Sequence, residues 1–195
     1  MSDAFIRWYR ESAITSVFSE QTELFERHGI HLFHPALGTA LVLDVEGNDV
    51  PVGREELDRL LGLRIASINV NWWLSADTNL VDEYSYEPLG CAIQTFWLDG
   101  LDEEEVQTVE AALMAAVVEL PVPTRALIID RCGDSEPDEW DSVVLYEGRT
   151  VARLSEGVTV IAQDQVAARL LRASPGLIRQ ETRIGLSRLA LHRRA

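Results

Sequence analysis

Three closely spaced segments in the middle of the chain constrain its fold most. Apolar residues occupy every second position from residue 68 to residue 74, which is the pattern of a half-buried strand. Residues 80–86 and 91–98 follow as two more strand-like segments, and the second link between them contains Pro88 and Gly90. Three consecutive strands with short links most simply form an antiparallel meander.

The clearest predicted helix covers residues 103–120. Asp102 is placed to cap its first turn, and Glu105, three residues later, to reach back to the backbone of Asp102. Pro121 and Pro123 prevent the helix from continuing. Two further helices are expected at residues 54–61, closed by Gly62, and at residues 165–173, capped by Asp164.

The remaining segments give weaker signals. Residues 3–28 contain neither Gly nor Pro and suit an amphipathic helix, although residues 5–9 also suit a short strand. Residues 184–191 match neither period cleanly. Further strands are expected at residues 41–45, 50–52, 125–130, 142–146 and 158–162. Pro51 favours an edge position for the second of them.

These elements predict an α+β protein with a mainly antiparallel sheet, built around the central meander, and helices packed against it. At 195 residues we expect a single domain, residues 1–195. Two cysteines set no disulfide framework, and the first residues lack the basic start of a secretory signal. The longest apolar run, residues 111–118, is too short to cross a bilayer. We therefore expect a cytoplasmic protein.

Charge is sorted along the chain. Residues 44–147 contain 24 acids and five arginines, whereas residues 165–195 contain seven arginines and one acid, Glu181. There is no lysine, which excludes Schiff-base chemistry and a P-loop lysine. A strongly negative surface repels nucleic acid and anionic membranes, so neither is expected as a partner. We expect the arginine-rich end to pair with acids of its own chain or of a second subunit in a homodimer.

No catalytic or cofactor motif stands out. His28, His31 and His34 are spaced by three, but Gly29 and Pro35 argue against a helix that would place them together on a metal. The acidic run at residues 134–141 lacks the glycine and glutamate that an EF-hand needs at its sixth and twelfth positions. We therefore expect no metal, no cofactor and a solvated acidic loop.

The favoured hypothesis is a non-enzymatic acidic protein that binds a basic protein partner. Immunity or inhibitor proteins that neutralise nuclease-type toxins have this size and charge, because acids and aromatic anchors complement a phosphate-binding cleft. The candidate partner-binding residues lie on the central strands and in the acidic run: Trp73, Asp82, Glu83, Tyr84, Tyr86, Asp134, Glu136, Asp138, Glu139 and Asp141.

The alternative is a small enzyme or a small-molecule-binding domain whose site is assembled from dispersed residues. Its participants would be His31, His34, Glu83 and Asp130. The two hypotheses differ in the surface they require. An enzyme needs a pocket with converging polar groups, whereas a protein-binding surface is flat or convex, acidic and aromatic.

Overall fold

The chain forms an α+β fold, as the sequence predicts. The computed structural model describes residues 3–11, 15–64, 67–87, 90–146, 155–174, 176–182 and 185–191. These residues contain ten strands and five helices, and the strand pairs within each of the two parts of the chain described below are antiparallel. The chain divides into two compact units. Unit 1 comprises Met1–Arg10 and Thr124–Ala195, and unit 2 comprises Glu11–Pro123. The expectation of a single domain stays a prediction.

Unit 2 contains five of the ten strands, and their centre is the predicted meander. The order is β3 (Asp49–Val52), β2 (Ala40–Leu43), β4 (Ile68–Trp73), β5 (Asn79–Glu87) and β6 (Cys91–Trp97). The β4 to β6 segment is continuous in register, with Asp82 opposite both Val70 and Phe96. The strand with Pro51, β3, lies at the end of this order, where a missing backbone N–H does not interrupt the sheet.

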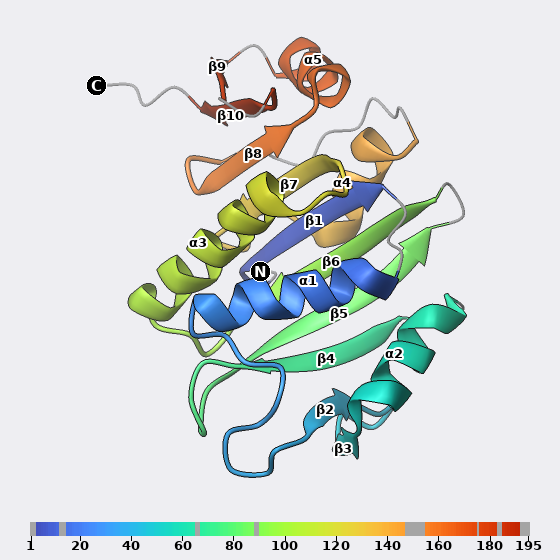
Figure 1. Ribbon diagram of the computed structural model, residues 1–195. Coiled ribbons are helices and arrows are strands. Elements are labelled where there is room, and N and C mark those ends of the chain that lie inside the picture. Colours follow the sequence, from blue (N-terminus) through green and yellow to red (C-terminus); the bar gives the residue numbers. More distant parts are fainter. Residues whose placement is uncertain are drawn as a thin grey trace. The chain divides into compact units, whose positions relative to one another are not determined.

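Three helices accompany this sheet: α1 (Thr15–Arg27), α2 (Arg54–Leu63) and α3 (Glu103–Glu119). Figure 1 shows α1 running across the strands of unit 2. Its Phe18 and Phe25 pack against Trp72 of β4, with ring centroids 5.7 and 4.9 Å apart. The predicted capping box of α3 is present: Asp102 accepts from the backbone of Glu104 and Glu105, and Glu105 accepts from the backbone of Asp102.

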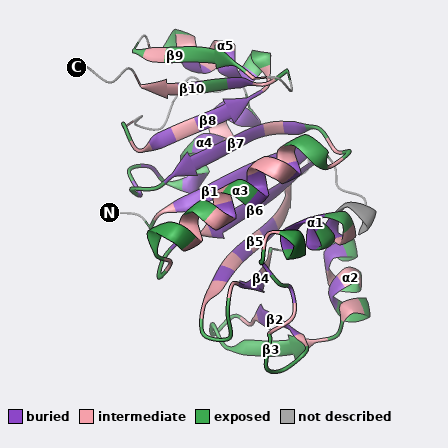
Figure 2. Ribbon diagram, turned by 60° about the vertical axis from the view of Figure 1, so that its left-hand side comes forward, coloured by how far each residue is buried: buried purple, intermediate pink, exposed green. Residues whose placement is uncertain are grey.

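Unit 1 contains the other five strands. The order is β1 (Phe5–Glu11, whose last residue is counted in unit 2), β7 (Thr124–Asp130), β8 (Val158–Ala162), β10 (Ser187–Leu191) and β9 (Leu177–Glu181). Two helices pack here, α4 (Pro137–Val144) and α5 (Asp164–Ala173). Figure 2 shows buried residues concentrated in β7 and β8 and exposed residues in β9. The core of unit 1 therefore lies over its inner strands.

Several expectations for single elements were wrong. Residues 142–146 are not a strand: α4 extends to Val144 because Trp140, Val143 and Val144 are buried along one side of a helix. α2 continues through Gly62 to Leu63, and Arg64 closes it in the left-handed region, with φ 52°. α5 already begins at Asp164, so its N-cap is Gln163.

The two ambiguous segments have definite structures. The N-terminal segment divides into the strand β1 and the helix α1, and residues 12–14 between them lie outside the described residues. The C-terminal segment contains the strand β10. In the described parts of the chain, no helix combines the length and the apolar composition needed to cross a membrane.

Candidate binding surface

The predicted partner-binding residues of unit 2 are divided between two faces of its sheet. Asp82, Tyr84 and Tyr86 lie on the face covered by α1, because alternate residues of a strand share a face. Asp82 and Tyr84 are fully buried, and Tyr86 is half-buried. The Tyr86 ring packs on Tyr84 at 5.2 Å, and the Arg64 guanidinium lies 5.4 Å from its centre. Only Tyr86 of this group reaches solvent.

Asp82 is a structural carboxylate. Its Oδ2 accepts hydrogen bonds from Trp72 Nε1 at 3.0 Å and from Gln94 Nε2 at 2.6 Å. Both donors come from the neighbouring strands, so the carboxylate joins β4, β5 and β6 beneath α1. Hydrogen bonds of this kind offset part of the cost of burying a carboxyl group. A partner could not reach Asp82 without displacing α1.

Trp73 and Glu83 lie on the opposite face. Trp73 is 7% exposed, because the loop after α1 covers it. His31 forms an isolated β-bridge with Trp73, and the His34 ring packs against the indole at 4.2 Å. Glu83 remains half-buried. The structure therefore places the aromatic anchors in packing contacts and leaves Glu83 partly accessible.

The acidic run at residues 134–141 belongs to unit 1 and leads into α4. Asp134, Glu136, Asp138 and Glu139 are exposed. Asp141 instead points inward, where its carboxylate receives two bonds from Arg7 Nη2 at 2.9 Å and one from the Tyr9 hydroxyl at 2.7 Å. The expected solvated loop is thus partly a helix, and one of its acids holds that helix to β1.

The Arg7–Tyr9–Asp141 cluster has a distinct electrostatic character. Burial raises the pKa of Tyr9 well above its usual value of 10, and the neighbouring Arg7 charge opposes this only in part. Burial disfavours the charge on Arg7, but electrostatic attraction and hydrogen bonds to Tyr9 and Asp141 outweigh it and raise the Arg7 pKa. At neutral pH Arg7 is therefore charged and Tyr9 is neutral.

The residues of the alternative, dispersed site have local structural partners. Asp130 is buried and accepts from the backbone of Cys132, Asp134 and Ser135 and from the Ser135 hydroxyl, which shapes the turn after β7. His34 Nδ1 accepts from the backbone of Ala36. Asp130 is in unit 1 and the histidines and Glu83 are in unit 2. Among the described residues, no three His, Cys, Asp or Glu side chains are placed to hold a metal ion.

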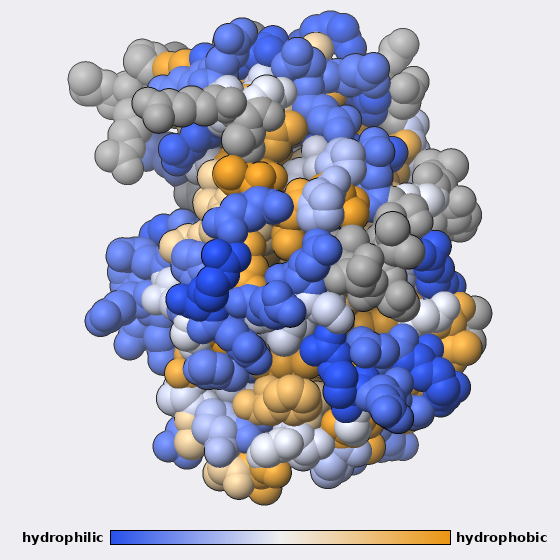
Figure 3. All heavy atoms as spheres, in the orientation of Figure 1, coloured by the Kyte–Doolittle hydropathy of each residue, from blue (hydrophilic) through white to orange (hydrophobic). Residues whose placement is uncertain are grey.

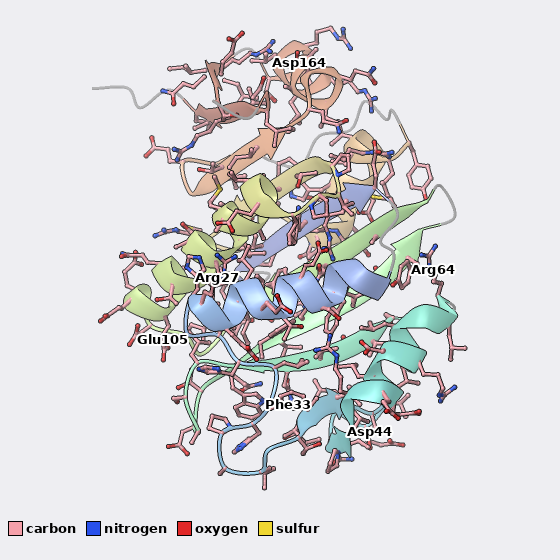
Figure 4. All side chains as sticks on the ribbon, viewed as in Figure 1. Arg27, Phe33, Asp44, Arg64, Glu105 and Asp164 are labelled. Carbon is pink, nitrogen blue, oxygen red and sulfur yellow. The ribbon has the colours of Figure 1, made fainter. Side chains whose placement is uncertain are left out.

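The outer surfaces of the three helices of unit 2 carry acids that the sequence analysis did not assign to a site. We call this set the acidic helical face. It consists of Glu20, Glu23 and Glu26 of α1, Glu55, Glu56 and Asp58 of α2, and Glu103, Glu104, Glu105, Glu110 and Glu119 of α3, all exposed or half-buried. Figure 3 shows hydrophilic residues over α2 and over the N-terminal end of α3. Figure 4 labels Glu105 in that end and Arg27 at the end of α1.

The arginines of the same helices pair locally. Arg27 contacts Glu119 at 2.8 Å, Arg54 contacts Asp58 at 3.2 Å, and Arg59 contacts Glu56 at 2.7 Å. Three arginines against eleven acids leave the acidic helical face with a large excess of negative charge. The three-residue spacing of Glu20, Glu23 and Glu26 is a sequence signal for such a face, because residues three apart are neighbours on a helix.

The two units differ in net charge, as do the sequence segments compared above. Unit 2 contains 21 acids and four arginines, a net charge of −17. Unit 1 contains 11 acids and 13 arginines, a net charge of +2. Part of the predicted internal pairing occurs within unit 1, where Arg179 contacts Asp164 at 2.6 Å. Unit 2 therefore carries the negative charge of the whole protein.

The chain matches no protein-family model, no curated protein and no solved structure. Its function has to be argued from the geometry and charge of its own residues.

Proposed function

We propose that the chain is a non-enzymatic binding protein that takes a basic protein partner on the acidic helical face of unit 2. The observation that carries this proposal is the excess of eleven acids over three arginines on the outer surfaces of α1, α2 and α3. A surface of one charge sign attracts a partner of the opposite sign and accelerates its association.

The arrangement of these acids indicates which class of partner would bind them. Glu20, Glu23 and Glu26 form a row along α1, with a rise of about 4.5 Å between successive residues. A regular row of carboxylates resembles the charge of a polyanion, so it fits a cleft that is lined with arginine or lysine for binding phosphates. An inhibitor of a nuclease-type toxin is the specific form of the proposal that suits this surface. Nucleic acid and anionic lipid would be repelled.

The exposed acids of unit 1 form a second, separate patch. Asp134 and Glu136 precede α4, and Asp138 and Glu139 lie in its first turn; all four are exposed, and Asp138 lies 3.6 Å from Arg7. These four acids form an independent candidate contact region for the partner. Glu83 and Tyr86 of unit 2, which are partly accessible, are further candidates. Asp82, Tyr84 and Trp73 would contribute by holding the sheet beneath the helices, because their side chains are buried.

Charge reversal on α1 tests the proposal. The protein is first used to recover its partner from the native host at low salt, and the association rate is then measured with the purified partner. The triple variant E20R/E23R/E26R should slow association by about tenfold or more at low salt, and added salt should reduce the difference. The complex of the unchanged protein should itself dissociate as salt rises.

The control variant has the same change of net charge at exposed positions away from the helices, E46R/D77R/E156R. Equal slowing by both triples would show that only net charge matters and would contradict a binding face on the helices. A variant of the unit 1 patch, D134R/E136R/D138R, measures the second region in the same assay. Recovery of only acidic or salt-insensitive partners would also count against the proposal.

A further inference from the structure

The edge strand β9 of unit 1 presents an open backbone. Within the described residues β9 pairs with β10 alone, through five continuous pairs from Leu177–Leu191 to Glu181–Ser187. Ile178, Arg179, Gln180 and Glu181 are all exposed. The outward N–H and C=O groups of such a strand are a template for pairing with another strand. We propose that β9 pairs antiparallel with β9 of a second copy of this chain.

β9 lacks two of the features with which proteins protect an edge, because it contains no proline and no register shift. The strand at the other end of the strand order, β3, is shorter and carries Pro51. Because proline cannot donate to a neighbouring strand, β3 is the protected edge and β9 is the open one.

The side chains of β9 favour pairing with itself in one register. When two copies are centred on Gln180, Arg179 of each copy lies opposite Glu181 of the other, and Ile178 lies opposite Thr182. The two-fold axis then makes two Arg–Glu pairs, each at the distance of directly opposed residues. Glu181 has no partner among the described residues, so its carboxylate is available for this pair. Ile178, which is 42% exposed, would be covered.

The side chain of Arg179 is held in position by residues of its own chain. Arg179, Glu181, Ser187 and Asp164 line a cavity of about 200 Å³ between the first turn of α5 and the β9–β10 hairpin. Arg179 donates to Asp164 at 2.6 Å, and Ser187 donates to the same carboxylate oxygen at 3.2 Å. Figure 4 labels Asp164 at the start of α5. The guanidinium is thus oriented on the face where the partner's Glu181 would arrive.

Charge also favours unit 1 as the contact between copies. Two copies of unit 2, each with a net charge of −17, repel one another, whereas unit 1 is close to neutral. A short strand pair buries a small area, so the dimer should be weak. Salt should strengthen it, because raising the ionic strength from 0.1 to 1 M shortens the Debye length from about 10 to about 3 Å and screens the long-range repulsion. Binding of a basic partner responds to salt in the opposite direction, so the two proposals can fail independently.

Two charge variants test the register. Glu181→Arg places arginine opposite Arg179, and Arg179→Glu places glutamate opposite Glu181, so each variant should lose self-association. A mixture of the two restores both opposite-charge pairs and should associate. Sedimentation velocity of the unchanged protein should show an average mass that rises from 21.8 kDa toward twice that value with concentration. Glu156→Arg, the same charge change at an exposed turn, should behave like the unchanged protein.

Hydrogen exchange on the unchanged protein keeps the proposal testable if a variant unfolds. The backbone amides of residues 178–182 should exchange more slowly as protein concentration rises, while those of β3 should not change. The proposal is overturned if the unchanged protein stays monomeric at high concentration and salt. It is equally overturned if Glu181→Arg associates as the unchanged protein does, if the mixture does not associate, or if the β9 amides show no dependence on concentration.

Discussion

The two units have similar secondary structure but differ in net charge and in where part of their carboxylates lie. Each has five antiparallel strands with helices, yet unit 2 has a net charge of −17 and unit 1 of +2. In unit 1, Asp130 and Asp141 turn inward and are hydrogen-bonded by backbone amides, Arg7 and Tyr9. In unit 2 most acids lie on the outer surfaces of helices. Strand order therefore does not dictate where charge is placed; the helices and loops decide it.

This difference gives the same residue type two energetic roles. A buried acid with a cationic partner is strongly coupled to the fold, because removing it leaves an uncompensated buried charge. An exposed acid changes the stability little and acts through the field that it creates. We therefore expect substitutions of Asp130 and Asp141 to alter stability, and substitutions on the acidic helical face to alter binding.

The largest effect should come from Asp141→Ala. Arg7 is 6% exposed and would keep its charge without its bidentate partner, so the substitution should cost about 3 kcal/mol. Urea unfolding and hydrogen exchange in β1 and α4 measure the loss. Asp138 lies 3.6 Å from Arg7 but its side chain is 93% exposed, so Asp138→Ala should cost less than about 1 kcal/mol. Similar losses in the two variants would contradict the inward role of Asp141.

Alkaline pH should destabilise the same cluster by removing the proton of the Tyr9 hydroxyl. Its folded pKa is raised, so the stability that its proton provides is present below the unfolded pKa of about 10 and is lost as pH rises toward the folded pKa. The contribution should fall by up to about 1.4 kcal/mol per pH unit above pH 10. In urea titrations from pH 8 to 11, the advantage of the unchanged protein over Tyr9→Phe should therefore shrink. A difference between the two proteins that stays constant up to pH 11 would contradict this role of the Tyr9 proton.

A smaller effect is expected where an acid of unit 2 has a local structural task. Asp102 caps α3 and accepts from two backbone N–H groups at 2.9 Å. Asp102→Ala should cost about 1 kcal/mol, seen in urea unfolding and in faster exchange at the first turn of α3. Asp102→Asn can still accept these bonds and should cost less than half as much. If Asp102→Ala lost as much unfolding free energy as Asp141→Ala, the expected difference between surface and buried acids would be contradicted.

Much of the fold could be predicted because its signals are local. Alternation over residues 68–74 and the pair Asp102 and Glu105 each act within one element, and β4 and the capped α3 appear as expected. The helix α4 was missed because its apolar residues Val143 and Val144 favour a strand by propensity. Pro137, followed by two acids, was the available start signal. Burial of Trp140 is a tertiary effect that decides the outcome.

The candidate surface was harder to predict, because both faces of β5 mix polar and apolar residues. Asp82 was taken as a surface acid, but it is buried and its Oδ2 accepts hydrogen bonds from β4 and β6, which come together only in the folded protein. The acidic stretch identified in the sequence, residues 44–147, also includes residues of both units. It included residues 130–141, whose charge is offset by arginines far away in the sequence but within unit 1. Charge sorting by unit is thus a property of the fold.

The smallest expected effect tests that sorting directly. Repulsion among 21 acids and four arginines should destabilise unit 2, and raising NaCl from 0.1 to 1 M should relieve it by less than about 1 kcal/mol, because exposed charges are already partly screened. Hydrogen exchange should show gained protection in β4 and β5 and less in β7 and β8, since general effects of salt act on both units. E20Q/E23Q/E26Q should reduce the gain in unit 2, whereas D134N/E136Q/D138N should leave it unchanged. Equal gains in both units would mean that the charge difference has no energetic consequence within the folded chain.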